Sequence, residues 1–119
     1  MADSSLKREF NRPASAEEIA IVRWMLNNAS VGDIAAYRDV NLEDLHVVAA
    51  CACGCISLDF EEGAWGHAKM IADATAEYPD GLRAGLILWG KDGRIVLLEV
   101  HDWDPDASHR MPTIADLRA

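Results

Sequence analysis

The sequence has few basic residues and no long hydrophobic run, and each shortage excludes a class of protein. Lys and Arg number 11 of 119 residues against 20 Asp and Glu, which gives a formal net charge of −9. A surface of that sign repels phosphate, so nucleic acid and anionic membranes are not expected partners. No stretch approaches the ~20 apolar residues that a membrane-spanning helix needs.

Cysteine is also scarce, because the chain has three and an odd number excludes a complete disulfide framework. The first 13 residues contain no apolar run, so the sequence predicts no signal peptide. These two features predict a cytoplasmic protein with reduced thiols.

What the sequence does contain is typical of one globular domain. Half of its residues are hydrophobic and 26% are charged, a balance that argues against disorder. We expect a flexible, polar lead-in over residues 1–13 and a single α+β domain over residues 14–119.

The clearest local signal is a helix over residues 15–28. Ser15 and Glu18 have the spacing of a capping box, in which each side chain accepts a hydrogen bond from the backbone N–H of the other residue. Apolar residues then recur with helical period. They are Ile19, Ile21, Val22, Met25 and Leu26.

The stretch LHVVAACACGCISLDF, residues 45–60, predicts two strands that meet at Ala52-Cys53-Gly54. After Gly54, apolar and polar residues alternate, as in a strand with one buried face. We therefore expect Ile56, Leu58 and Phe60 to point into the core.

Three further strands are expected over residues 68–77, 83–90 and 94–103. The first is rich in alanine, which also suits a helix, and the turn at Tyr78-Pro79-Asp80-Gly81 favours the strand. The Asp-Gly pair in Lys91-Asp92-Gly93 is a strong hairpin signal. The whole pattern predicts an N-terminal helix packed on a four- to five-stranded antiparallel meander.

The last two strands are apolar on both faces, which is typical of strands covered on both sides. One helix covers one side only. The other side needs residues 29–44, the C-terminal segment or a second subunit, so we expect a homodimer.

Cys51, Cys53 and Cys55 admit three interpretations. In an extended strand they share a face with Cα atoms about 7 Å apart, which disfavours a disulfide. They are small hydrophobic residues, or zinc ligands completed by a histidine, or a reactive thiol. Small hydrophobic residues are the favoured interpretation, because no second cysteine pair is present.

A second group of candidates lies on the last long strand. Glu99, His101 and Trp103 share one strand face. If that face also carries Cys55, Ser57 and Asp59, it would form a polar cluster able to bind a ligand or to support acid–base chemistry.

The segments CACGCISLDF and PDGLRAGLILWGKDGRIVLLEVHDW resemble a group of small uncharacterised bacterial proteins. That group shares a Cys-x-Cys-Gly-Cys-x-Ser-x-Asp-Phe core and a late Leu-Glu-Val strand. The layout over residues 13–117 is also similar to a domain of unknown function found near bacterial toxin systems. In that domain small residues and a methionine replace the cysteines. The resemblance implies an immunity-like, acidic inhibitor.

The leading hypothesis is therefore a small acidic module that binds a basic protein, without catalysis and without a cofactor. One alternative is a zinc or redox-sensing site at Cys51, Cys53 and Cys55. The other is a small enzyme that uses the polar sheet face. The sequence has no glycine-rich phosphate loop, no GxSxG and no HExxH motif.

Overall fold

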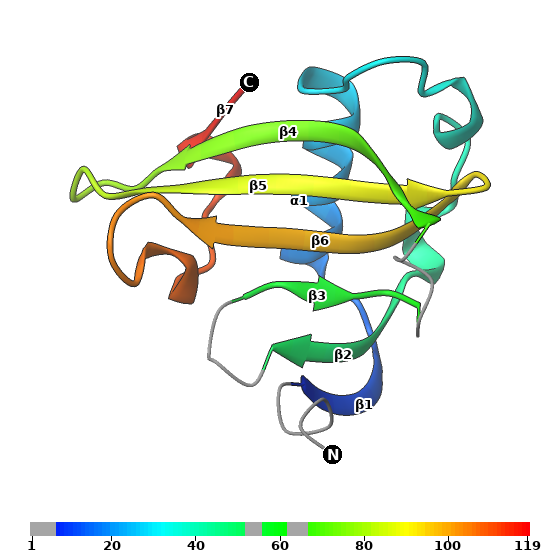
Figure 1. Ribbon diagram of the computed structural model, residues 1–119, viewed down its shortest axis with the longest axis horizontal. Helices are drawn as coiled ribbons and strands as arrows, with labels where there is room; N and C mark the ends of the chain where they lie inside the picture. The colour runs from blue at the N-terminus through cyan, green and yellow to red at the C-terminus, as the bar shows by residue number, and fades with distance from the viewer. Residues whose placement is uncertain (1–6, 52–55, 62–66) are drawn as a thin grey trace.

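The computed structural model describes residues 7–51, 56–61 and 67–119, which form an antiparallel sheet with one α-helix behind it (Figure 1). The fold is α+β, as predicted. The described strands number seven rather than four or five, in the order β1-β2-β3-β6-β5-β4-β7. The elements are β1 (Lys7–Pro13), α1 (Ala16–Asn28), β2 (His46–Cys51), β3 (Leu58–Asp59), β4 (Lys69–Glu77), β5 (Arg83–Lys91), β6 (Arg94–Asp102) and β7 (Leu117–Arg118).

The two strands absent from the sequence prediction are the outermost ones. β1 pairs with β2 within the stretch that we expected to be a flexible lead-in, while residues 1–6 lie outside the described residues. Its sequence, KREFNRP, lacks the apolar alternation that identifies a half-buried strand. β7 is two residues long and pairs with β4 at Thr75 and Ala76. A strand of that length has no periodicity to detect.

The predicted hairpin is present as β2 and β3, which pair in antiparallel fashion, and its turn at residues 52–55 lies outside the described residues. Leu58 and Phe60 are both buried, as expected. The meander is correct only for β4, β5 and β6, because β3 pairs with β6 rather than with β4. Leu58 lies opposite Leu98 in that pairing.

The ambiguous alanine-rich segment is a strand, β4, as predicted. β5 and β6 are joined by the expected tight turn, in which Asp92 has φ 50° and Gly93 has φ 79°. Positive φ at both central positions is what a two-residue hairpin turn requires, and it explains the Asp-Gly pair.

The main core lies between α1 and the sheet. The apolar stripe of α1 is buried, with Val22 and Met25 fully enclosed. It packs against inward-facing residues of the central strands, including Leu86, Leu88 and Leu98, which are 0% exposed. Burying each large aliphatic side chain stabilises the fold by about 1.5–3 kcal/mol. None of the helices formed by the described residues is long and apolar enough to cross a membrane.

The segments that we expected to cover the second face lie on the same side as α1. Residues 29–44 form two short 3-10 turns, Ala35–Tyr37 and Leu42–Asp44, whose buried side chains join the helix-side core. Ala107 and Leu117 of the C-terminal segment join it too. Among the described residues, no helix lies over the opposite face, which is turned towards the reader in Figure 1.

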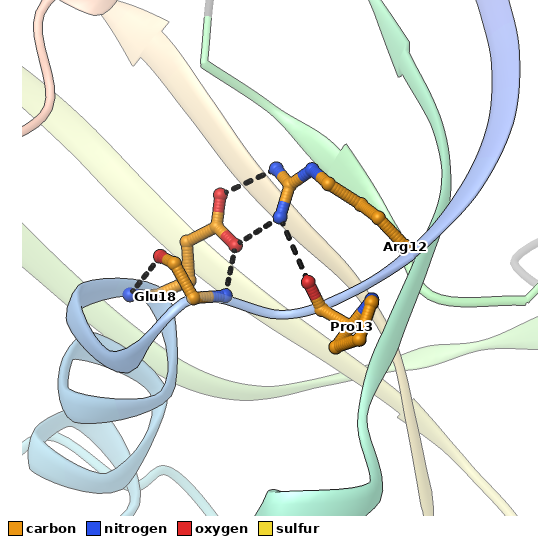
Figure 2. A network of polar contacts seen from close by, with 4 residues as sticks. Arg12, Pro13 and Glu18 are labelled. Carbon is orange, nitrogen blue, oxygen red and sulfur yellow. Dashed lines mark hydrogen bonds and ion pairs between the residues drawn. The ribbon is translucent and has the colours of Figure 1, made fainter.

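An ion pair joins β1 to the first turn of α1 (Figure 2). Arg12 Nη1 and Nη2 donate to the two carboxylate oxygens of Glu18, each at 2.8 Å. The capping box is present, because the Ser15 amide donates to Glu18 Oε1 at 2.8 Å and the Glu18 amide donates to Ser15 Oγ at 3.1 Å. The Glu18 side chain is 6% exposed, so these contacts satisfy a buried charge.

The hydrogen bonds from Arg12 lower the pKa of Glu18, helped by those from Ser15 and opposed by burial. We expect Glu18→Gln to lower the free energy of unfolding at pH 7 by about 1–3 kcal/mol. The contribution of the carboxylate is complete above the unfolded-state pKa of about 4.3 and disappears as the pH falls through the lower folded-state value. Urea denaturation at a series of pH values from about 6 to about 2 should therefore show that the difference in unfolding free energy between wild type and variant becomes smaller as the pH falls.

Glu17→Gln is the matched control, because Glu17 is an exposed acid in the same helical turn. It removes the same charge from the N-terminus of the helix, which is worth about 0.3–1 kcal/mol. Equal losses in the two variants would contradict a specific role for the Arg12–Glu18 pair.

Candidate functional site

The sheet face opposite α1, called the outer face here, is defined by the cross-strand register. Residues directly opposite each other in an antiparallel pair point to the same side of the sheet. Trp89 and Leu97 belong to a cluster separate from the helix-side core, which places their row on the outer face. The three rows are Met70–Trp89–Leu97–Asp59–Ala49, Asp73–Ile87–Glu99 and Arg118–Thr75–Gly85–His101.

The first row is largely apolar, and the acids gather beside it. Met70 is 40% exposed, and Trp89 is half-buried against Leu97. Asp59, Asp73 and Glu99 supply three carboxylates to the three rows, against one arginine, Arg118. The outer face thus combines net negative charge with an apolar strip in which Met70 is exposed, Trp89 is half-buried, and Leu97 and Ala49 are buried.

Glu99 is held by a tryptophan of the neighbouring strand. The indole Nε1 of Trp89 donates to Glu99 Oε1 at 3.0 Å across the β5–β6 pair. An indole N–H is a donor only, so it suits the ionised form of the carboxylate. The contact fixes the carboxylate over the middle of the sheet and leaves Glu99 Oε2 without a hydrogen bond among the described residues.

The His101 ring lies over the neighbouring strand β5 at the position of Gly85. A Cβ atom on Gly85 would stand 2.3 Å from His101 Nε2 and 2.8 Å from Trp103 Nε1, so only glycine leaves room for the two rings. The Trp103 indole donates to His101 Nε2 at 3.4 Å, which places the proton of a neutral imidazole on Nδ1. That Nδ1 is buried and has no hydrogen-bond partner among the described residues.

Trp103 is the most exposed large hydrophobic residue of the described chain, at 53%. The guanidinium of Arg83 lies 5.6 Å from the centre of its ring, a cation–π distance. The Arg83 amide also donates to Asp104 Oδ2 at 2.8 Å, which holds the segment after β6 against β5. An exposed indole is thereby positioned at the end of the outer face.

The predicted polar cluster is only partly assembled. The register places Asp59, Glu99 and His101 on the outer face, with Trp103 against His101, while Cys55 lies outside the described residues. Among the described residues, no hydrogen bond or ion pair links Glu99 to His101. The polar contacts of these two side chains go to tryptophans instead.

Ser57 takes part in strand pairing, and Cys51 lies at the end of β2. The Ser57 hydroxyl accepts from the Val100 amide at 2.8 Å and donates to the Val100 carbonyl at 3.1 Å, so it continues the pairing of β3 with β6. Cys53 lies outside the described residues, and Cys51 ends β2 with a side chain that is not described. Within residues 7–51, 56–61 and 67–119, no group of three or more His, Cys, Asp or Glu could hold a metal ion. The zinc hypothesis therefore rests on positions beyond the described residues.

Of two features of the outer face that sequence reasoning missed, one had a weak signal in the sequence and the other had none. Gly85 interrupts the apolar run of β5, and an isolated glycine in a strand indicates close approach of another group. The bond between Trp89 and Glu99 had no local signal, because it depends on the diagonal register between two strands.

We expect Gly85→Ala to displace the His101 and Trp103 rings, because the new methyl group would occupy their present positions. Both rings can swing into solvent, so the cost in stability should stay within about 1 kcal/mol. In ¹H–¹⁵N spectra the indole N–H signal of Trp103 should move towards that of a fully exposed indole. The signal of Trp89, bonded to Glu99 in another row, serves as the internal control. An unmoved Trp103 signal would refute the packing described above.

No protein-family model, no curated protein and no solved structure matches this chain.

Proposed function

We propose that this chain is a binding module whose outer face holds a basic protein. The observation that carries the proposal is a partly exposed apolar strip, with Met70 40% exposed and Trp89 half-buried, beside three carboxylates on a face that no described helix covers. Exposed apolar patches rimmed by polar groups mark interaction sites.

The chemistry of the face suits arginine and lysine side chains. Glu99 and Asp73 flank Ile87 in one cross-strand row, so a cation lying along that row would meet a carboxylate at each end. Trp89 and Trp103 offer ring faces to a guanidinium, and Trp103 already contacts one from Arg83. The net charge of −9 would also speed the encounter with a basic partner.

The resemblance to a domain found near bacterial toxin systems adds a candidate for that partner. An immunity-like protein binds a toxin and blocks it, and an acidic inhibitor is complementary to a basic toxin. Binding through a rigid sheet face needs no catalytic group, which agrees with the engagement of Glu99 and His101 by tryptophans.

We also propose that the free chain forms a homodimer through the same face, which the basic partner displaces. A second copy would cover the apolar strip around Met70 and Trp89. Asp59, Asp73 and Glu99 would then approach carboxylates of the other copy, so the dimer should be weak and favoured by salt. Light scattering should give a higher average mass at high salt, and Met70→Asp should abolish the increase. A salt-independent monomer would refute the dimer.

Binding of a basic partner can be tested with a fluorescein-labelled, arginine-rich peptide. We expect fluorescence anisotropy to show binding at low salt that weakens as salt is added. Asp73→Asn combined with Glu99→Gln should weaken it about fivefold to tenfold, because exposed ion pairs each contribute about 0.2–1 kcal/mol.

The matched control combines Glu17→Gln with Asp39→Asn, which removes two exposed acids outside the outer face. Both double variants change the net charge from −9 by two units. At about 0.15 M salt, where the Debye length is about 8 Å, the control should bind the peptide within about twofold of wild type, because distant charges are screened. Equal weakening in both double variants would show that binding follows net charge and not the outer face.

A further inference from the structure

A cavity of about 340 Å³ on the other side of the molecule gathers basic side chains in this acidic chain. It lies between the 3-10 turn Ala35–Tyr37, the beginning of β4 and the β5–β6 turn. Its lining residues are Ala36, Tyr37, His67, Lys69, Gly90, Lys91, Asp92 and Gly93. The lining thus contains two lysines and a histidine but a single carboxylate, that of Asp92.

The lysines of this cavity lack the ion pairs that most other cations have. Five arginines are paired with carboxylates, namely Arg12, Arg23, Arg83, Arg94 and Arg110. Among the described residues, neither Lys69 nor Lys91 has a carboxylate within ion-pair distance. Unpaired ammonium groups at a concave surface are suited to an anionic ligand.

Tyr37 provides a second and independent observation. Its side chain is buried, with 2% of the residue exposed, and it also lines the cavity. The phenol end of the ring lies against Gly90, where an added Cβ would stand 2.6 Å from Cε1 and 2.8 Å from Cζ. Gly90 lines the same cavity, so the phenol end of Tyr37 lies in its wall.

Lys69 is positioned next to this phenol. Its Nζ lies 5.9 Å from the centre of the Tyr37 ring, a cation–π distance. An ammonium group and a hydroxyl that lie close together can both donate to one oxyanion. Lys91, which lines the same cavity, precedes the tight turn at Asp92 and Gly93.

We propose that this cavity binds a small molecule through a phosphate or carboxylate group. Lys69 and Lys91 neutralise the oxyanion, and the Tyr37 hydroxyl donates a hydrogen bond to it. The volume is within the range of small-molecule sites, about 300–1,000 Å³, so the ligand is larger than the oxyanion alone. The site is separate from the outer face and does not depend on the function proposed for that face.

The test is a titration of the ¹⁵N-labelled protein with sodium phosphate and, separately, with sodium acetate, each at constant ionic strength set by sodium chloride. We expect saturable shifts at the amides of Gly90, Lys91 and Gly93, with a dissociation constant on the order of millimolar. Saturation by phosphate alone assigns a phosphate ligand, and saturation by acetate alone assigns a carboxylate. Shifts that do not saturate, or that chloride alone reproduces, would overturn the proposal.

Variants separate the three proposed contacts. Lys69→Gln and Lys91→Gln should each weaken oxyanion binding about fivefold to tenfold, and Tyr37→Phe, which removes only the hydroxyl, about threefold. Arg118→Gln is the charge-matched control, because Arg118 is an exposed cation on β7, where it pairs with the far end of β4. Unchanged binding in the Tyr37→Phe and Lys69→Gln variants would also overturn the proposal.

Discussion

In the described part of the chain, a single α-helix of 13 residues packs on one face of a seven-stranded sheet, and the other features follow from this unequal cover. α1, the short 3-10 turns and the C-terminal segment all bury their apolar side chains on the same side. That side has the large core, with Leu86, Leu88 and Leu98 fully enclosed. The opposite side keeps a strip of half-buried apolar residues between carboxylates.

The position of α1 is itself determined by contacts at its first turn. The Ser15 capping box begins the helix, and the two-pronged pair of Arg12 and Glu18 ties that beginning to β1. Because Glu18 is buried, removing either partner leaves an uncompensated polar group. The pair therefore sets where the helix enters the core, while the apolar stripe sets which of its sides is buried.

Local patterns in the sequence predicted much of this fold. The capping box and the Asp-Gly turn are rules about neighbouring residues, and the alternation after Gly54 correctly placed Leu58 and Phe60 in the core. The pairing of β3 with β6 was not predictable in this way, because it joins residues about 40 positions apart in sequence. β1 and β7 were missed because their own residues have no apolar period.

In the candidate sites, too, features with a local sequence signal were predicted, and features that depend on distant parts of the chain were not. Glu99 and His101 were placed on one strand face from alternation alone, and the register agrees. Their tryptophan partners, and the glycine beneath His101, depend on the neighbouring strand. The cavity at Tyr37 had no sequence signal, since its lysines come from two strands and its hydroxyl from a 3-10 turn. The role of all these residues in binding stays a prediction.

The arrangement of the outermost strands has a consequence for aggregation. Exposed strand edges invite pairing with other chains. The outer edge of β4 is occupied in part by β7 and in part by residues 29–31, whose backbone bonds to Ile71 and Asp73. At the other edge, β1 has the charged sequence KREFNRP, an irregular register after Glu9 and a terminal proline. Charge, irregularity and proline all oppose edge-to-edge growth of fibrils. Both edges of the described sheet therefore resist extension by strands of neighbouring molecules.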